Sequence, residues 1–303
     1  MNNVLKPFFE NKNRGFQIVT LAFLLVLGML VFSALGTLVA AAVYGQFGMT
    51  GLDIKQQAGF LRIVQSFSSV GTFMLPALAF SWCAKRSVYS YNKLDKLPDY
   101  RLTDIVLVMS LVILPLVMGL SEWNDSVHLP GFMQRFDAWM RKLDENNADL
   151  LKLMVQDRSI GILLINVFVM AVLPALGEEL FFRGTIQTFL QGWTRSPNWA
   201  IWITAFIFSA IHFQITGFIP RMLLGAYLGY LFYWSGSLWL PILAHFMHNG
   251  LSILSDYIFT LRGYDVNSLN FSDLHNYEII FIVSVILAIG GVMLLRKNRM
   301  TKN

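Results

Sequence analysis

The chain has 303 residues, of which 55% are hydrophobic and 14% are charged. Soluble domains carry about 25% charged residues, so this composition excludes a soluble globular protein, and its 25 Phe, 8 Trp and 14 Met exclude a disordered one. The single cysteine, Cys83, excludes an intrachain disulfide and any multi-cysteine metal site. The formal net charge of +5 would suit nucleic acid, but in so apolar a chain the positions of the charges decide their meaning.

Apolar segments of about 20 residues, the length needed to cross a bilayer, recur along the whole chain. The first follows Lys12 and Arg14 and exceeds the ~7–15-residue apolar core of a signal peptide, so we expect a retained membrane anchor. Eight spans are predicted, at residues 16–44, 63–82, 103–120, 160–190, 199–213, 219–234, 238–259 and 278–295. The predicted fold class is therefore an all-α, multi-pass transmembrane helix bundle of about eight spans.

The basic residues gather on one side of these spans. An even number of spans puts both termini on that side, together with 14 of the 23 Lys and Arg residues: Lys6, Lys12, Arg14, Lys85, Arg86, Lys93, Lys96, Arg101, Arg183, Arg195, Arg296, Lys297, Arg299 and Lys302. Most acids fall on the other side: Asp53, Glu122, Asp125, Asp137, Asp144, Glu145, Asp149, Asp157, Asp265, Asp273 and Glu278.

By the positive-inside rule, the basic side is cytoplasmic. We therefore expect an integral membrane protein with both termini in the cytoplasm, located in the inner (cell) membrane if the host is bacterial. The basic C-terminal segment is interpreted as a stop-transfer flank, and no nucleic acid partner is expected.

Residues 121–159 form the only sizeable segment expected outside the membrane. Phe132, Phe136, Trp139, Met140 and Leu143 recur there at helical spacing with charged residues between them. This pattern predicts an amphipathic helix that lies on the outer interface or caps the bundle. A structural cover is the expected role, and a functional lid is the alternative. The chain then divides into residues 1–159, a helix core at 160–260, and a final span with a basic tail at 261–303.

Ionisable side chains inside spans are costly and are functional candidates by default. Arg62, Arg221 and Asp256 fall near span ends, and the others cluster between residues 178 and 249: Glu178, Glu179, Arg183, His212, His245 and His248, with Asn249 beside them. At a rise of 1.5 Å per residue, Glu178 lies about 18 Å, His212 about 20 Å and the 245–249 segment about 10–17 Å from the cytoplasmic end. Three helices therefore place these side chains at a similar depth in the membrane.

Helix geometry gives the two glutamates different roles. Adjacent residues point 100° apart, whereas Glu179 and Arg183 are four residues apart and share a face, in the favoured order for an ion pair. Glu178 is then unpaired and available as a general base. A purely structural buried pair between Glu179 and Arg183 is the alternative.

The remaining polar residues pair at the same four-residue spacing. Phe208 shares a face with His212 and is expected to shield and fix the imidazole, although a core histidine bonded to a backbone carbonyl is equally compatible. His245 shares a face with Asn249, and His248 lies at the edge of that face. The alternative for these three is hydrogen bonding between helices, which Asn and His commonly provide in membranes.

Three short motifs account for most of these residues. Glu178–Arg183 resembles EExxxR, Phe208–His212 resembles FxxxH, and His245–Asn249 resembles HxxxN. In this order and within about 70 residues of a multi-spanning chain, they resemble the CPBP family. That family comprises the type II CAAX prenyl endopeptidases and the bacterial bacteriocin-processing and self-immunity proteins, also called the Abi family. The resemblance covers about residues 160–260.

The resemblance implies an intramembrane endopeptidase that hydrolyses a peptide bond near the C-terminus of a membrane-associated or lipidated protein or peptide. It implies that Glu178 activates a water together with His212, that His245 and Asn249 stabilise the oxyanion, and that no cofactor is needed. The implied supporting residues are Glu179, Arg183 and Phe208. Attack by water also suits the residues themselves, since Cys83 is distant and no Ser sits beside a base at motif spacing. The expected partners are a peptide or protein substrate and membrane lipid.

Three other functions remain open on the same residues. A zinc protease would use Glu178, His212 and His245 as metal ligands, although the chain has no HExxH motif. A transporter could relay protons through the buried Glu and His residues, although no inverted repeat supports it. A non-catalytic immunity or partner-binding membrane protein is the third alternative.

Overall fold

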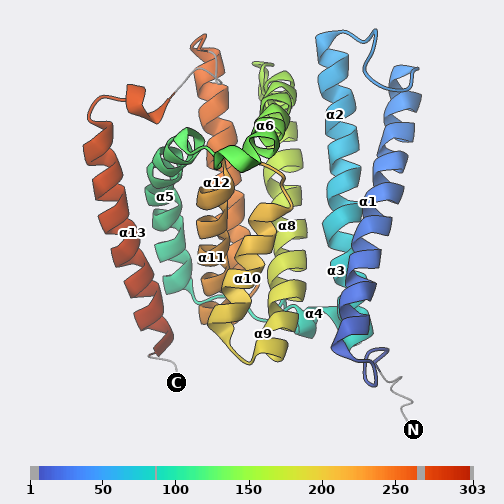
Figure 1. Cartoon of the computed structure of the whole chain (residues 1–303), viewed down its shortest axis with the longest axis vertical. Coiled ribbons are helices and arrows are strands. Elements are labelled where there is room, and N and C mark those ends of the chain that lie inside the picture. The colour runs from blue at the N-terminus through green and yellow to red at the C-terminus, as the bar shows by residue number, and fades with distance from the viewer. Residues whose placement is uncertain (1–6, 86, 265–269, 301–303) are drawn as a thin grey trace.

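The computed structural model describes residues 7–85, 87–264 and 270–300, and over these residues the chain forms helices, turns and no strand. Lys6, Arg86, Asp265 and Lys302, which entered the charge count above, lie outside the described residues. The long helices run roughly side by side and alternate in direction (Figure 1). An all-α membrane bundle is therefore confirmed as the fold class.

An antiparallel helix pair forms one edge of the bundle (Figure 1). α1 (Arg14–Tyr44) rises along this edge, and α2 (Ile54–Ser69) returns beside it. Through a π-helical stretch at Val70–Met74, α2 continues into α3 (Leu75–Lys85), which ends at the basic residue predicted to stop this span. The short α4 (Val88–Tyr91) then leads to α5 (Tyr100–Ser126) in the main body of the bundle.

A single long helix from Ile160 to Thr194 carries both glutamates of the first motif. It contains α7 (Ile160–Val167), α8 (Leu173–Glu179) and α9 (Thr188–Thr194), joined by π-helical stretches at Phe168–Val172 and Leu180–Gln187. π-Helical turns are rare and occur frequently at functional sites. The two stretches flank Glu178 and Glu179 on either side.

The remaining long helices complete the core and the second edge. They are α10 (Pro197–Ala210), α11 (Phe218–Ser235), α12 (Trp239–Leu261) and α13 (Tyr277–Met300). The first residues of α1 and the last residues of α13 lie at the same end of the bundle (Figure 1). This arrangement agrees with an even number of passes.

A helix occupies each of the eight predicted positions, but only five of the described helices are long and apolar enough to cross a membrane on those criteria. They are α1, α2–α3, α5, α7–α9 and α13. α10 falls short because it has 14 residues, about 21 Å of helix, and the chain turns at the second motif. α12 is long, but His245, His248 and Asn249 interrupt its apolar sequence.

The predicted outer helix is α6 (Gln134–Val155), which lies near the end of the bundle opposite the termini (Figure 1). Its aromatic residues face away from the bundle: Phe132, just before α6, is 87% exposed, and Phe136 and Trp139 are also exposed. Aromatic side chains in this position suit the membrane–water interface. The expected apolar stripe therefore does not pack as a unit, because only Met140 of these residues is buried.

Two carboxylates attach α6 to the bundle and its loops. Asp137 accepts hydrogen bonds from His128, Arg141 and the Leu129 N–H. The hydrogen bond from His128, together with those from Arg141 and the Leu129 N–H, holds the pKa of Asp137 below its usual range. Asp144 accepts from both the backbone N–H and the hydroxyl of Thr216, in the turn between α10 and α11. α6 is therefore fixed against the loop that follows the FxxxH motif.

Arg62 links the N-terminal helix pair to the core. Its side chain is 7% exposed in the middle of α2. Nε donates to Asn166 of α7 at 2.7 Å, and Nη2 donates to the carbonyl of Met154 at the end of α6 at 2.6 Å. Because a buried guanidinium must be hydrogen-bonded, this residue ties three helices together.

Arg62→Met is expected to lower the free energy of unfolding by roughly 2–3 kcal/mol, because it removes two hydrogen bonds made by a charged group and leaves Asn166 short of a donor. Lys55→Met on the same helix is the matched control, since Lys55 is exposed. Thermal unfolding of the purified protein in detergent measures both. Equal melting temperatures for the two variants would contradict the assigned role of Arg62.

Candidate active site

A cavity of about 420 Å³ lies inside the bundle where α5, α8, α10, α11 and α12 approach one another. It contains all four residues predicted to carry the chemistry. Its wall is formed by Val117, Ser121, Leu151, Glu178, Phe208, His212, Pro220, Arg221, Leu224, His245, His248, Asn249 and Ser252. Glu178 and Asn249, which are 71 positions apart in the sequence, are therefore brought to one chamber, as their predicted depths indicate.

The ion pair predicted between Glu179 and Arg183 is present and completely buried. Arg183 Nη1 lies 2.7 Å from Glu179 Oε1, and both side chains are 0% exposed. The predicted location of Arg183, among the basic residues of the cytoplasmic side, is therefore wrong. Its guanidinium lies inside the bundle because Glu179, the Gly225 carbonyl at 3.0 Å and the Phe208 ring at 4.8 Å replace its water.

The same carboxylate of Glu179 orients His245. His245 Nδ1 lies 2.8 Å from Glu179 Oε1, so the carboxylate places a hydrogen on Nδ1. The other ring nitrogen, Nε2, then lies 3.9 Å from Oε2 of Glu178. Glu179 therefore acts as the structural partner of both Arg183 and His245, while Glu178 makes neither bond and lies at the cavity wall.

His212 is fixed in a similar way by a main-chain carbonyl. Its Nδ1 lies 2.7 Å from the carbonyl oxygen of Phe208 at the end of α10. Because a carbonyl only accepts, Nδ1 carries the hydrogen, and Nε2 keeps a free lone pair when the ring is neutral. The Phe208 ring contacts the imidazole edge at a centroid distance of 5.1 Å. Phe208 therefore contacts His212, as predicted. His212 is bonded to a carbonyl and also lines the cavity.

Asn249 forms a hydrogen bond with a helix carbonyl that lacks its usual donor because of a proline. Its Nδ2 donates to the carbonyl oxygen of Met170 at 3.3 Å. Four residues further on, Pro174 has no N–H, so the usual helical donor to the Met170 carbonyl does not exist. Asn249 supplies a hydrogen bond in its place and keeps a second N–H hydrogen that this bond does not use.

Comparison with known proteins agrees with this geometry. Residues 160–251 match the family model described as "Type II CAAX prenyl endopeptidase Rce1-like". The matched residues contain all three motifs. This segment is similar to the Rce1-like family. The resemblance predicted from the motifs is therefore confirmed for this part of the chain, and the family together with the five membrane helices makes the chain an integral membrane protein.

A curated relative matches part of the same chain. "Uncharacterized protein YpbD" of Bacillus subtilis (strain 168) is 33% identical over 86 residues, which cover 27% of this chain and 41% of the relative. The chain thus matches less than half of that relative's length. No solved structure matches the chain.

Two glycines of α11 complete the surroundings of the Rce1-like motifs. The carbonyl of Gly225 accepts from Arg183, and one turn later the carbonyl of Gly229 accepts from Gln187 at 3.0 Å. An added Cβ at Gly229 would lie 2.8 Å from Gln187 Oε1, so a larger residue would require the Gln187 amide to shift. Sequence reasoning missed this contact, although the spacing Gly225-x-x-x-Gly229 is a known signal for close helix packing.

Arg221 is the main cavity residue that the sequence analysis did not select. It was set aside as lying near a span end, yet its side chain lines the same cavity as Glu178 and His212. His248, whose role the motifs leave open, also lines this cavity, and its Nδ1 is buried without a hydrogen-bond partner. Arg221 could have been selected from the sequence as a basic residue one turn into an otherwise apolar helix.

Glu178 also lines a second cavity of about 460 Å³ on the other side of α8. Residues from α2 and α6 form its other walls, including Ser69, Asn147 and Met154. Leu151 of α6 lines both cavities. The outer helix therefore contributes to both cavities at Glu178, which connects its position to the site.

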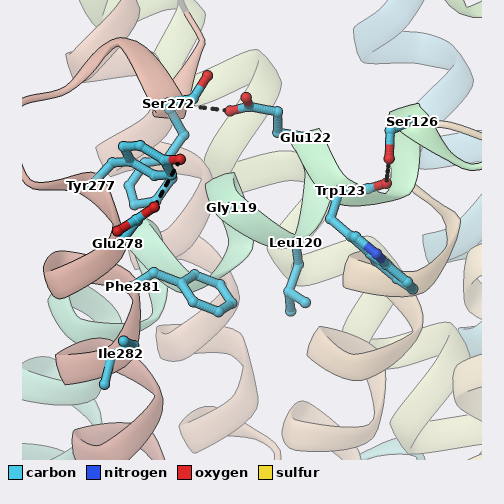
Figure 2. Close-up of a pocket in the computed structure, with 11 residues that line it drawn as sticks. Gly119, Leu120, Glu122, Trp123, Ser126, Ser272, Tyr277, Glu278, Phe281 and Ile282 are labelled. Atoms are coloured by element: carbon cyan, nitrogen blue, oxygen red, sulfur yellow. Dashed lines mark hydrogen bonds between the residues drawn. The ribbon is translucent and has the colours of Figure 1, made fainter.

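A larger cavity, about 740 Å³, lies away from these residues, between α5 and the start of α13. Figure 2 shows its polar groups, with Glu122 bonded to the backbone of Ser272 and Glu278 beside Tyr277. It contains no histidine and none of the motif residues. Size alone is therefore a poor guide here, and the smaller chamber is the candidate active site.

The zinc alternative would need Glu178, His212 and His245 to converge on one point. Among the residues that the structure describes, no group of three or more His, Cys, Asp or Glu side chains is arranged to hold a metal ion. The Nδ1 atoms of both histidines are already engaged by Phe208 and Glu179.

Glu179→Gln is expected to lower the free energy of unfolding by about 3–5 kcal/mol, because it leaves the buried charge of Arg183 uncompensated. Glu178→Gln is the isosteric control on the adjacent residue, and it should unfold close to wild type because Glu178 has no ion-pair partner of this kind. Thermal unfolding in detergent compares the two. A lower melting temperature for Glu178→Gln than for Glu179→Gln would reverse the roles assigned to the glutamates.

Proposed function

We propose that the chain is an intramembrane endopeptidase that hydrolyses a peptide bond near the C-terminus of a membrane-associated or lipidated protein or peptide. The observation that carries the proposal is the chamber itself: a glutamate outside the Glu179–Arg183 ion pair, two oriented histidines and an amide meet in a cavity of about 420 Å³. The match of residues 160–251 to a family model of endopeptidases supports the same reaction class. A chamber enclosed by helices of a membrane bundle favours substrates that are already at the membrane.

In the proposed mechanism a water molecule attacks the carbonyl carbon of the scissile bond. Glu178 accepts a proton from this water, and Nε2 of His212, with its lone pair free, orients the water or shares the proton. The proton taken up by Glu178 then passes to the leaving amine nitrogen as the C–N bond breaks. No protein nucleophile is needed, and atoms and protons balance.

Charge on the tetrahedral intermediate is stabilised by His245 and Asn249. Glu179 accepts the hydrogen on Nδ1 of His245 and fixes the ring, so that Nε2, when it also carries a proton, donates to the intermediate from the side of Glu178. Asn249 contributes its second N–H, and its bond to Met170 fixes the amide in place. Preorganised donors of this kind supply much of the rate acceleration in hydrolysis.

Glu178→Gln is expected to reduce turnover by at least about 10²-fold through loss of the base, and Asn249→Ala by roughly 10²–10³-fold with little change in KM. The measurement compares protein C-termini by mass spectrometry in membranes that contain wild type or Glu178→Gln, followed by kinetics on the peptide so identified. Wild-type turnover in Glu178→Gln would overturn the assignment.

A metal mechanism predicts a different pattern in the same assay. It requires loss of activity with a strong chelator, recovery on addition of Zn²⁺, stoichiometric zinc in the purified protein and only a modest effect of Asn249→Ala. The water mechanism proposed here requires that activity survives chelation. If C-termini are identical with wild type and Glu178→Gln, the non-catalytic alternative is favoured.

We also propose that both termini are cytoplasmic, because the helix ends that carry most of the basic residues lie at the same end of the bundle as the termini. Single cysteines introduced at Lys96 and Glu145 in a Cys83→Ser background test this, since both residues are exposed near opposite ends. Glu145→Cys should react with an impermeant maleimide in intact cells, and Lys96→Cys only after lysis. The reverse pattern would invert the topology.

A further inference from the structure

Arg221 is a cation in the candidate active site that has no role in the proposed mechanism. The Arg221 side chain lines the cavity that also contains Glu178, and its buried Nη1 has no hydrogen-bond partner among the residues that the structure describes. Nη2 donates to Oε1 of Gln214, which is neutral. Since a guanidinium in a protein stays charged, an unpaired N–H in a buried cavity is unfavourable until a ligand accepts its hydrogen bond.

Arg221 also lies where a second positive charge is already present. It is the fourth residue of α11, and its guanidinium folds back over the start of that helix. An added Cβ on Gly217, the residue just before α11, would lie 2.9 Å from Nη2 of Arg221. The N-terminal end of a helix carries a partial positive charge, so a cation placed there is opposed by the helix and an anion is favoured.

The acids near Arg221 do not supply the missing hydrogen-bond acceptor. Asp144 and Glu178 both act on Arg221 electrostatically, but neither forms an ion pair with it among the described residues. Asp144 uses Oδ2 for Thr216, and its Oδ1 is itself buried without a partner. Glu178 is the proposed base. The guanidinium and the helix end therefore present an anion site on the wall of the reaction chamber.

The rest of the chamber limits what the anion can be attached to. Val117, Leu151 and Leu224 line it with apolar surface, and its volume of about 420 Å³ is in the range of sites for small ligands. A short apolar peptide with a terminal carboxylate matches both features, whereas a two-chain lipid exceeds the space.

We propose that Arg221 binds the C-terminal carboxylate of the peptide substrate. This inference rests on the proposed peptidase function and gives it a physical basis for selectivity. An arginine fork binds a carboxylate through charge-assisted hydrogen bonds, and a chain that lacks a free terminus in the chamber leaves the guanidinium unpaired. The site therefore selects bonds close to a free C-terminus and rejects internal bonds of long segments.

The first experiment compares two peptides of identical sequence, one ending in a carboxylate and one in a carboxamide, as substrates of the purified full-length protein. Wild type should prefer the acid by roughly 10- to 100-fold in kcat/KM, with the difference mainly in KM. Arg221→Gln should bring the ratio close to one, and Arg221→Lys should restore part of it. A wild-type ratio near one, or a ratio unchanged in Arg221→Gln, would overturn the proposal.

Asp144→Asn tests whether Arg221 acts only as a structural counter-ion of α6. In that case Asp144→Asn would abolish the preference for the acid as fully as Arg221→Gln does, and the proposal fails. If Arg221 binds the substrate, Asp144→Asn keeps the preference, because the guanidinium and the helix end remain.

A binding experiment separates this inference from the peptidase function. Trileucine and trileucine amide are titrated into the Glu178→Gln protein and into the Glu178→Gln, Arg221→Gln double variant. Binding of the acid at least 10-fold tighter than the amide, lost in the double variant, supports the carboxylate site even if no hydrolysis is found. Equal binding of the two peptides overturns it. Displacement of trileucine by inorganic phosphate at similar concentrations would assign the site to phosphate groups and also overturn it.

Discussion

The site depends on one charge that the bundle must neutralise, the guanidinium of Arg183. Its burial is tolerable only because a carboxylate, a carbonyl and an aromatic face surround it: Glu179, Gly225 and Phe208. Two of these partners have a second function, since Glu179 fixes His245 and Phe208 holds His212 through both its ring and its carbonyl. Removal of one member of such a network leaves the others unsatisfied. The ion pair therefore sets the positions of both histidines without lining the cavity itself.

Irregular helix geometry makes these contacts available. In a regular α-helix the carbonyls are bonded within the helix, yet here main-chain oxygens of the π-helical stretch before α8, of α10 and of α11 accept hydrogen bonds from side chains. Pro174 frees the carbonyl of Met170 for Asn249, and the π-helical stretch after Glu179 carries Arg183 and Gln187 toward the glycines of α11. Within a membrane such freed groups are tolerated when neighbouring helices satisfy them. The same neighbours thereby hold the polar side chains in fixed positions.

The helices outside the 160–251 segment shape the chamber. α5 contributes Val117 and Ser121 to its wall, and α6 contributes Leu151 and, through Asp144, holds the turn that leads to Arg221. α2 forms the far side of the second cavity at Glu178. The family motifs thus carry the polar groups, whereas the N-terminal half decides the volume, the apolar lining and the cover of the site.

The sequence by itself determined the all-α membrane class, the eight helix positions and the ion pair of Glu179 with Arg183, because hydropathy and four-residue spacing are local properties of a helix. It also selected Glu178, His212, His245 and Asn249, since polar residues are rare within apolar runs. Only the tertiary structure decided that Arg183 is buried, that α6 turns its aromatic residues outward, and that Arg221, His248 and Gly229 belong to the site. These features arise where separate helices meet, and contacts between helices depend on rotation and distance, which no single helix encodes.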